Sequence, residues 1–174
     1  GGIRGTFTAA VLAKWDDMLK KGGDNNLVKH FDLVAGTSTG AILAIGLGLG
    51  LTPNEMLSFY KSKGSKIFPK NRKLRHWLNS KHDSQTLREI LKEVLGENTL
   101  LSESCCKLVI PTVRAAHGET EVITTPHTED RTGFHGITAV DAALASSAAP
   151  TYFDEAVVDS EIAVENSTTS FSSP

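Results

Sequence analysis

The chain has 174 residues, of which 40% are hydrophobic and 22% are charged. This length suits one domain, and the apolar content is sufficient for a sizeable core, so disorder throughout is excluded. The net charge of -2 argues against a nucleic-acid-binding protein, because such proteins usually carry a basic excess. No apolar run approaches the roughly 20 residues of a membrane-spanning helix, so any membrane contact is expected to be peripheral.

The cysteines and histidines offer no metal site. Cys105 and Cys106 are adjacent, which gives neither a disulfide framework nor a spaced pair of ligands. No His, Cys and carboxylate cluster has ligand spacing, so we expect no metal and no cofactor. The unpaired thiols favour a reducing, cytoplasmic location.

The chain opens with a glycine-rich segment, Gly1-Gly2-Ile3-Arg4-Gly5. Such a loop can expose consecutive N–H groups as a nest for an anion, and the alternative is a flexible end. From Thr6 to Lys20, apolar residues recur four apart, at Phe7, Val11, Trp15 and Leu19. This spacing predicts an amphipathic helix with Trp15 in the core.

The next segment predicts a strand, a sharp turn and a helix around one serine. Phe31 to Ala35 is a nearly continuous apolar run, typical of a strand buried on both faces of a parallel sheet. It leads into Gly36-Thr37-Ser38-Thr39-Gly40, which fits the G-x-S-x-G nucleophile elbow and needs small residues at both glycines. An apolar helix is predicted from Ala41 to Leu51, with its positive dipole end beside Ser38. Ser38 is therefore the predicted nucleophile, and an ordinary strand-to-helix loop is the alternative.

A basic stretch follows the next predicted helix, which begins at Thr52 and runs to about Lys63. From Lys61 to His82 the chain holds eight lysines and arginines and no acidic residue, interleaved with apolar side chains. This mixture suits contact with an anionic membrane surface, and a solvated face over a second core patch is the alternative. Binding of nucleic acid is not expected.

The following elements are predicted as scaffold. Leu87 to Leu95 has helical spacing, and the ranges 107–114 and 121–125 are rich in Val and Ile, as strands are. Three histidines lie in loops around these strands, at His117, His127 and His135. Any one of them could complete a Ser-His-Asp set with Ser38.

A helix is predicted from Thr138, which can form a capping box with Asp141. Its continuation, Ala142 to Ala149, contains almost only small residues, which allow close backbone packing. We therefore expect this segment to support the Ser38 elbow. The chain then reads Ala145-Ser146-Ser147-Ala148-Ala149-Pro150-Thr151-Tyr152-Phe153.

Together, the Gly1–Gly5 segment, the 36–40 elbow and the 145–153 segment resemble the patatin-like phospholipases. The resemblance covers residues 1 to about 160. It implies an α/β fold, a three-layer αβα sandwich with a central, mostly parallel sheet. It also implies lipid acyl hydrolase activity of the phospholipase A type on glycerolipids, with a Ser-Asp dyad. The glycine-rich loop, here Gly1, Gly2, Ile3, Arg4 and Gly5, would supply the oxyanion hole, and the substrate would be a phospholipid or another acyl lipid.

One motif that the resemblance requires is missing. The family pattern places the catalytic aspartate in Asp-Gly-Gly or Asp-Gly-Ala, whereas here Glu155 follows Asp154 and Ser160 follows Asp159. Asp159 is the remaining candidate. After Glu165 the chain becomes a hydroxyl-rich tail, 166–174, typical of disorder. The sequence thus predicts a partial patatin-like domain at 1–165, incomplete at both ends, and this chain is expected to be inactive.

Other functional readings follow from the same residues. A catalytically inactive fragment or lipid-binding pseudoenzyme would keep the fold core without turnover. A Ser-His-Asp esterase would need a histidine within hydrogen-bond reach of Ser38. A narrower resemblance, to bacterial patatin-like effectors switched on by nucleotide signals, places any regulatory region outside these residues.

Overall fold

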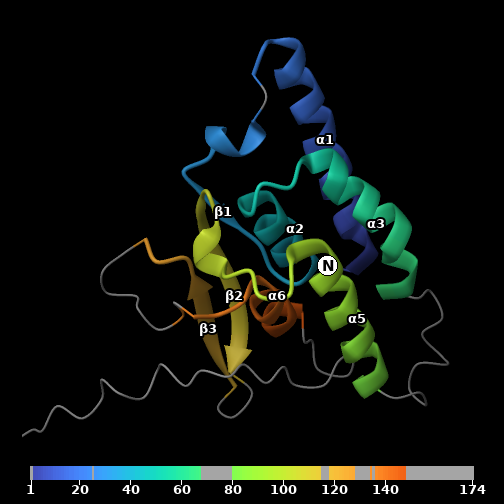
Figure 1. Cartoon of the computed structure of the whole chain (residues 1–174), viewed down its shortest axis with the longest axis vertical. Coiled ribbons are helices and arrows are strands. Elements are labelled where there is room, and N and C mark those ends of the chain that lie inside the picture. Colours follow the sequence, from blue (N-terminus) through green and yellow to red (C-terminus); the bar gives the residue numbers. More distant parts are fainter. Residues whose placement is uncertain are drawn as a thin grey trace, which may run out of the picture.

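A three-stranded sheet lies beside a group of helices in the computed structural model, which describes residues 2–24, 26–67, 80–114, 118–127, 134 and 136–147 (Figure 1). The strand order is β1 (Leu33–Ala35), β2 (Lys107–Arg114) and β3 (Glu119–Thr124). β1 pairs with β2 in parallel, with Ala35 opposite Val109, and β2 pairs with β3 in antiparallel fashion. The α/β class is confirmed, with a mixed sheet in the described part.

The predicted helices are present, with small changes at their ends. The α-helices are α1 (Gly5–Lys21), α2 (Thr39–Gly48), α3 (Pro53–Ile67), α5 (Ser80–Leu95) and α6 (Ala139–Ser147). Short 3-10 turns are η1 (Gly2–Arg4), η2 (Leu27–His30) and η3 (Leu101–Glu103). At the start of α3, the capping box forms as predicted, because Glu55 Oε2 accepts from Thr52 N–H at 2.7 Å. No helix in the described ranges is long and apolar enough to span a membrane.

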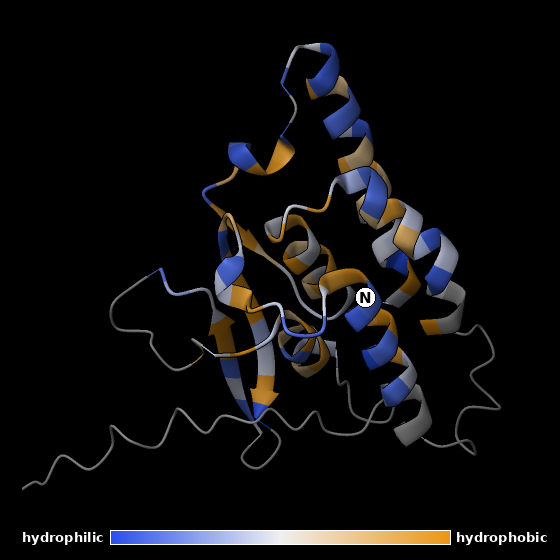
Figure 2. Ribbon diagram, viewed as in Figure 1, coloured by the Kyte–Doolittle hydropathy of each residue, from blue (hydrophilic) through white to orange (hydrophobic). Residues whose placement is uncertain are grey.

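Helix α2 occupies the centre of the core. Nearly all of its residues are buried, including Ile42 and Ile45, and its ribbon is mainly orange in Figure 2. Both α2 and α6 contact β2, and they contact each other. The strand side chains on that face, such as Leu108 and Ile110, are buried. A helix that is apolar all round must be enclosed by other elements, which explains its central position.

The opposite face of the sheet is exposed in the described part. Leu33 has 44% of its surface exposed and Val113 has 63%, whereas the alternate residues Leu108 and Ile110 are buried. The prediction that Phe31 to Ala35 is buried on both faces is therefore wrong for these residues. A continuous apolar run fits a doubly covered strand, but α2 and α6 cover one face only.

The prediction that Trp15 lies in the core is also wrong. The buried face of α1 consists of Gly5, Ala9, Ala13 and Asp16. The larger apolar side chains on the other face are exposed, with Phe7 at 75% and Trp15 at 51%. Helix α1 packs against α3, and small side chains on its inner face let the two backbones approach closely.

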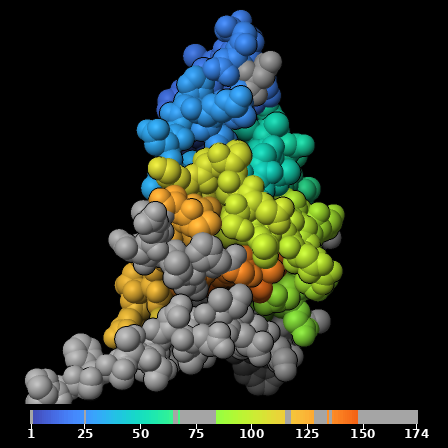
Figure 3. Space-filling model, turned by 60° about the vertical axis from the view of Figure 1, so that its left-hand side comes forward, coloured from blue at the N-terminus to red at the C-terminus, as the bar shows by residue number. Residues whose placement is uncertain are grey.

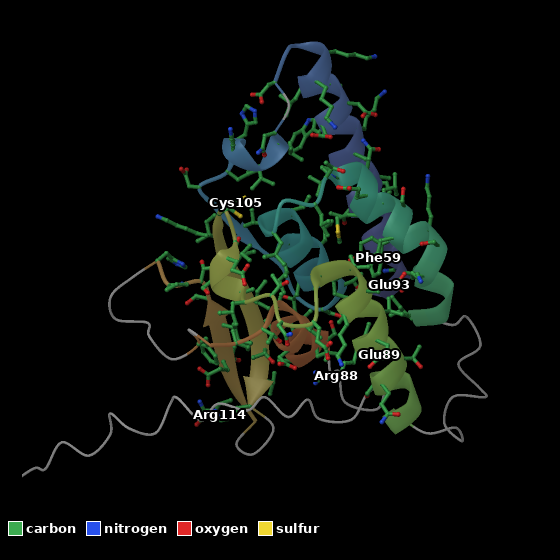
Figure 4. All side chains as sticks on the ribbon, in the orientation of Figure 1. Phe59, Arg88, Glu89, Glu93, Cys105 and Arg114 are labelled. Atoms are coloured by element: carbon green, nitrogen blue, oxygen red, sulfur yellow. The ribbon has the colours of Figure 1, made fainter. Side chains whose placement is uncertain are left out.

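Helix α6 is fixed to α5 and to its own cap by one carboxylate. Asp141 Oδ1 lies 2.8 Å from an Arg88 guanidinium nitrogen, and Asp141 Oδ2 accepts from the Thr138 hydroxyl at 2.7 Å. Arg88, labelled in Figure 4, extends from α5 toward α6. These contacts position the helix that carries the small-residue segment.

Candidate active site

Ser38 sits between the end of β1 and the start of α2 in a strained conformation. Its φ of 57° and ψ of -122° make it the one non-glycine residue with positive φ in the described part of the chain. These angles are those of the first central residue of a type II′ turn, a position that normally requires glycine. The Ser38 carbonyl accepts the first helical bonds, from Ala41 N–H at 2.9 Å and Ile42 N–H at 3.2 Å. The strained serine at a strand-to-helix elbow is thus observed as predicted.

The two glycines of the elbow have different roles. A Cβ at Gly36 would lie 2.1 Å from the Gly40 carbonyl oxygen, so a side chain cannot fit there. A Cβ at Gly40 would meet nothing within 4 Å. The predicted need for a residue without bulk is therefore confirmed at Gly36, whereas Gly40 has room for at least a Cβ.

The backbone of Ser38 is held by Ser146 of α6. Ser146 Oγ accepts from Ser38 N–H at 3.0 Å and donates to the Pro111 carbonyl at 2.7 Å. One hydroxyl therefore joins the elbow, α6 and β2. The Thr112 hydroxyl reinforces this junction by donating to the Ala145 carbonyl at 2.7 Å. The expectation that the small-residue segment supports the elbow is confirmed, although the sequence did not single out Ser146.

Thr39, the residue after Ser38, is enclosed by two other elements. The buried Tyr60 hydroxyl donates to the Thr39 carbonyl at 2.6 Å. Burial raises the pKa of the Tyr60 hydroxyl, which keeps it a neutral donor. The Thr39 methyl group lies so close to Gly5 that a Cβ there would be 2.3 Å from it. Glycine at position 5 is therefore required by packing.

The glycine-rich segment is thereby placed beside the elbow. Gly2 has a φ of 59°, η1 spans Gly2–Arg4, and α1 begins at Gly5. Contact between Gly5 and Thr39 brings the N-terminal ends of α1 and α2 together next to Ser38. Both ends carry free N–H groups and positive partial charge, which favours negative charge at this point. Ile3 and Arg4 are exposed, and Gly1 lies outside the described residues.

Among the hydrogen bonds of the described residues, none joins the Ser38 hydroxyl to a histidine or a carboxylate that could accept its proton. His127 follows the carboxyl end of β3. That end of β3 and the amino end of β1 lie at the same end of the sheet, whereas Ser38 follows β1 at the other end. The positions of His117, His135, Asp154 and Asp159 lie outside the described residues. Within the described ranges, no three His, Cys, Asp or Glu side chains form a group that could hold a metal ion.

Comparison with known proteins identifies the family. The family model for patatin-like phospholipase matches residues 1–168. The chain belongs to the patatin-like phospholipase family. It is 36% identical over 157 residues to a cGAMP-activated phospholipase of Pseudomonas aeruginosa, covering 88% of this chain and 46% of that protein. It is 34% identical over 166 residues to a protein of the same name from Vibrio cholerae, covering 88% and 47%.

A plant relative extends the comparison. The chain is 30% identical over 172 residues to patatin-like protein 2 of Arabidopsis thaliana, covering 87% of this chain and 41% of that protein. The chain thus spans about half the length of the curated relatives it matches. The family resemblance inferred from three short motifs is therefore confirmed for residues 1–168 of this chain. The α/β fold class that it implied is confirmed as well.

Proposed function

We propose that this patatin-like chain carries the nucleophile of a lipid acyl hydrolase that cleaves ester bonds of glycerophospholipids. The observation that carries the proposal is the strained Ser38 elbow, with the glycine-rich segment packed against Thr39. A backbone with φ of 57° at a non-glycine residue costs energy, and such strain persists mainly where the surrounding structure enforces it. Family membership supports the same reaction class.

In the proposed mechanism, Ser38 Oγ attacks the ester carbonyl carbon while an aspartate accepts the hydroxyl proton. The tetrahedral intermediate places negative charge on the former carbonyl oxygen. Amides of the Gly1–Gly5 segment and the start of α2 would donate to that oxygen. Collapse expels the alcohol, which takes the proton back from the aspartate, and leaves an acyl-serine. Water, activated by the same aspartate, then releases the fatty acid.

The test of this assignment is covalent labelling of the complete parent enzyme, which supplies the base, with a fluorophosphonate. We expect labelling at Ser38 in the wild type and none in Ser38→Ala, with Ser102→Ala as a control serine on the surface turn η3. Mass spectrometry of the labelled peptide identifies the modified residue. Label on a different serine in the Ser38→Ala variant would contradict the assignment.

We further propose that these 174 residues alone show little turnover. A serine hydroxyl is a poor nucleophile without a base, and general-base help contributes about 10²–10⁴-fold. Asp159, the remaining candidate, lacks the glycine that follows the family's aspartate. Hydrolysis of a fluorogenic phospholipid by the wild type and by Asp159→Asn tests this. Substantial turnover that Asp159→Asn abolishes would show that Asp159 is the base and that the chain is active.

Control of the whole protein by a cyclic dinucleotide is a second proposal. Three of the relatives carry the name cGAMP-activated phospholipase, and each is 34% to 36% identical to this chain over the aligned residues. We propose that hydrolysis by the complete protein is likewise switched on by such a nucleotide. Measuring phospholipid hydrolysis with and without cGAMP tests the proposal directly.

Membrane contact is proposed for the basic segment from Lys61 to His82. One of its lysines is engaged within the protein, because Lys63 Nζ lies 2.9 Å from Glu93. Lys61 is exposed, and positions 68–79 lie outside the described residues. We expect the chain to bind anionic vesicles better than neutral ones, and less well as salt screens charges beyond about 8 Å. Replacing Lys70, Arg72 and Lys73 by glutamine should weaken that binding, whereas equal binding to both vesicle types would favour a solvated face.

A reducing, cytoplasmic location is proposed on the basis of the cysteines. Cys105 and Cys106 are both free thiols. Alkylation of the native protein taken directly from cells, followed by mass spectrometry, should find both thiols reduced. A disulfide through either residue would contradict the proposed compartment.

A further inference from the structure

The outer face of α1 carries a stripe of large, exposed apolar side chains. They recur three or four residues apart, are between 45% and 75% exposed, and comprise Phe7, Val11, Trp15 and Met18. Residues at this spacing share one side of a helix. The stripe lies opposite the small buried residues through which α1 packs against α3. In Figure 3 the N-terminal segments, drawn in blue, form the upper end of the molecule, with α3 beside them.

Positive charge borders this apolar stripe. Lys14 follows Phe7 by seven residues and Lys21 follows Met18 by three, so both lysines lie on the same side of α1 as the stripe. Both lysines are exposed. Apolar residues that include Phe and Trp on one face, with lysines at the border, are the composition of helices that lie in the surface of a bilayer.

The two carboxylates of α1 are turned away from the stripe. Asp16 belongs to the buried face of the helix and lies 2.6 Å from Lys20. Asp17 accepts a hydrogen bond from the side-chain amide of Asn54, in α3, at 3.1 Å. Both carboxylates are thus engaged on the side of α1 that meets α3. The stripe and its lysines therefore form a surface that is complementary to negative charge.

The stripe begins beside the candidate active site. Phe7 lies two residues after Gly5, and a Cβ at Gly5 would lie 2.3 Å from the Thr39 methyl group. Thr39 directly follows Ser38. A bilayer that contacts the outer face of α1 would therefore lie near the elbow, where an ester group of a lipid must arrive to be attacked.

The start of the basic segment from Lys61 to His82 lies at the same end of α1. Ile3 is 48% exposed, and its Cδ1 would be 2.9 Å from a Cβ at Gly64 of α3. Gly64 belongs to that basic segment. The apolar stripe and the segment proposed to contact anionic lipid are thus neighbours at the end of α1 that adjoins the elbow.

We propose that α1 docks on an anionic phospholipid bilayer, with its apolar stripe among the acyl chains and with Lys14 and Lys21 on headgroup phosphates. The benefit to catalysis rests on the proposed function, because docking holds the Ser38 elbow against the surface that contains the substrate. Binding itself requires no hydrolysis. This contact is distinct from the charge-based contact proposed for the basic segment, because the burial of apolar side chains is not screened by salt.

A bilayer fits this surface better than a protein partner does. Trp15 carries an apolar ring with an N–H donor, which suits the boundary between acyl chains and headgroups. A fluid surface needs no matching groove for a single row of side chains on a convex helix. The cores of protein interfaces are depleted in lysine, whereas Lys14 lies within this stripe and can reach headgroup phosphates.

The experiment is co-sedimentation of the complete protein with vesicles of phosphatidylcholine alone and of phosphatidylcholine with phosphatidylglycerol. All forms carry Ser38→Ala, which prevents turnover. We expect binding to the anionic vesicles, weakened at least about tenfold when Phe7→Ser and Met18→Ser are combined. The matched control is Val113→Ser, at a 63% exposed apolar residue of β2, which should bind as the parent form does. Since these side chains are exposed, thermal melts of the variants should coincide.

Salt and fluorescence separate insertion from charge attraction. At high salt the parent form should retain part of its vesicle binding, and the double variant should lose that part. The emission of Trp15, obtained by comparison with Trp15→Phe, should shift to shorter wavelength when vesicles are added and should be quenched by brominated lipid. Complete loss of binding at high salt would mean that the stripe does not insert.

Three further results overturn the proposal. The first is vesicle binding that the double variant leaves unchanged. The second is a Trp15 that acrylamide cannot reach before vesicles are added, because another part of the complete protein then covers the stripe. The third is a dimer of the parent form that the double variant dissociates, because the stripe then joins two copies. Fluorophosphonate labelling is measured separately on protein that retains Ser38, so failure of the proposed enzymatic function leaves the binding result standing.

Discussion

Replacing Ser146 with alanine should destabilise the protein and impair Ser38 without touching its side chain. The substitution removes the hydroxyl that accepts from Ser38 N–H at 3.0 Å and donates to the Pro111 carbonyl at 2.7 Å. Two backbone groups in a partly buried junction then lose their partner. A fully buried backbone group without a partner lowers the free energy of unfolding by about 1–3 kcal/mol. Because this junction is only partly buried, we expect Ser146→Ala to lower the free energy of unfolding by about 1–2 kcal/mol in total.

That loss of stability is comparable with the strain energy of the Ser38 backbone. A non-glycine residue held in such a conformation stores about 1–3 kcal/mol, which the surrounding contacts must offset. For a chain of this size, about 1–2 kcal/mol corresponds to a fall in melting temperature of roughly 2–8 °C. The rate of fluorophosphonate labelling at Ser38 should fall as well, because the elbow can relax away from the reactive geometry.

The neighbouring serine provides a matched control. Ser147 is only 5% exposed, and its hydroxyl has no hydrogen-bond partner in the described part of the protein. Ser147→Ala removes a buried polar group that gains nothing, so it should leave stability unchanged or raise it. Circular dichroism melts and labelling time courses compare the two variants. If Ser146→Ala melts and reacts like Ser147→Ala, the Ser146 bridge does not hold the elbow.

Five further substitutions test the elbow and the helices α1 and α3. Gly36→Ala should prevent folding or labelling, because its Cβ would lie 2.1 Å from a carbonyl oxygen. Gly40→Ala should be tolerated, since a Cβ there would meet nothing within 4 Å. Equal losses of melting temperature and labelling rate in the two variants would contradict this. Tyr60→Phe removes the donor to a buried carbonyl and should cost about 1–2 kcal/mol in chemical unfolding. Trp15→Gln should change stability by less than about 0.5 kcal/mol, whereas Ala9→Leu, at a fully buried site, should cost about 1–3 kcal/mol. A larger loss in Trp15→Gln would place that side chain in a packed environment.

The local parts of the site were predictable because their signals are local. The elbow needs a strand, a glycine and a helix start within one short segment, and Ser38 with Gly36 satisfies that requirement in the sequence. The capping box at Thr52 and Glu55 is likewise a short-range pattern, and it forms. Each motif involves backbone groups a few residues apart, so the chain specifies it without reference to the rest of the fold.

The errors arose where distant segments decide the outcome. Apolar periodicity placed Trp15 in the core, but it does not say which face of α1 meets α3. The structure buries Ala9 and Ala13 instead, because small residues allow the closer approach. The role of Ser146 was hidden for the same reason, since its partners Ser38 and Pro111 are distant in sequence. Asp159, the candidate base, lies outside the described residues, so the proposed dyad stays a prediction.

The nucleophile geometry depends on several elements rather than on the elbow alone. The Val109 carbonyl of β2 accepts from Gly36 N–H at 3.1 Å. The Tyr60 hydroxyl of α3 donates to the Thr39 carbonyl, and the Ser146 hydroxyl of α6 accepts from Ser38 N–H. None of these contacts exists in an isolated elbow peptide. The strained backbone should therefore persist only while the sheet and its helices are assembled. Reactivity of Ser38 toward a fluorophosphonate should disappear together with the folded state, which makes that label a reporter of the fold as well as of the site.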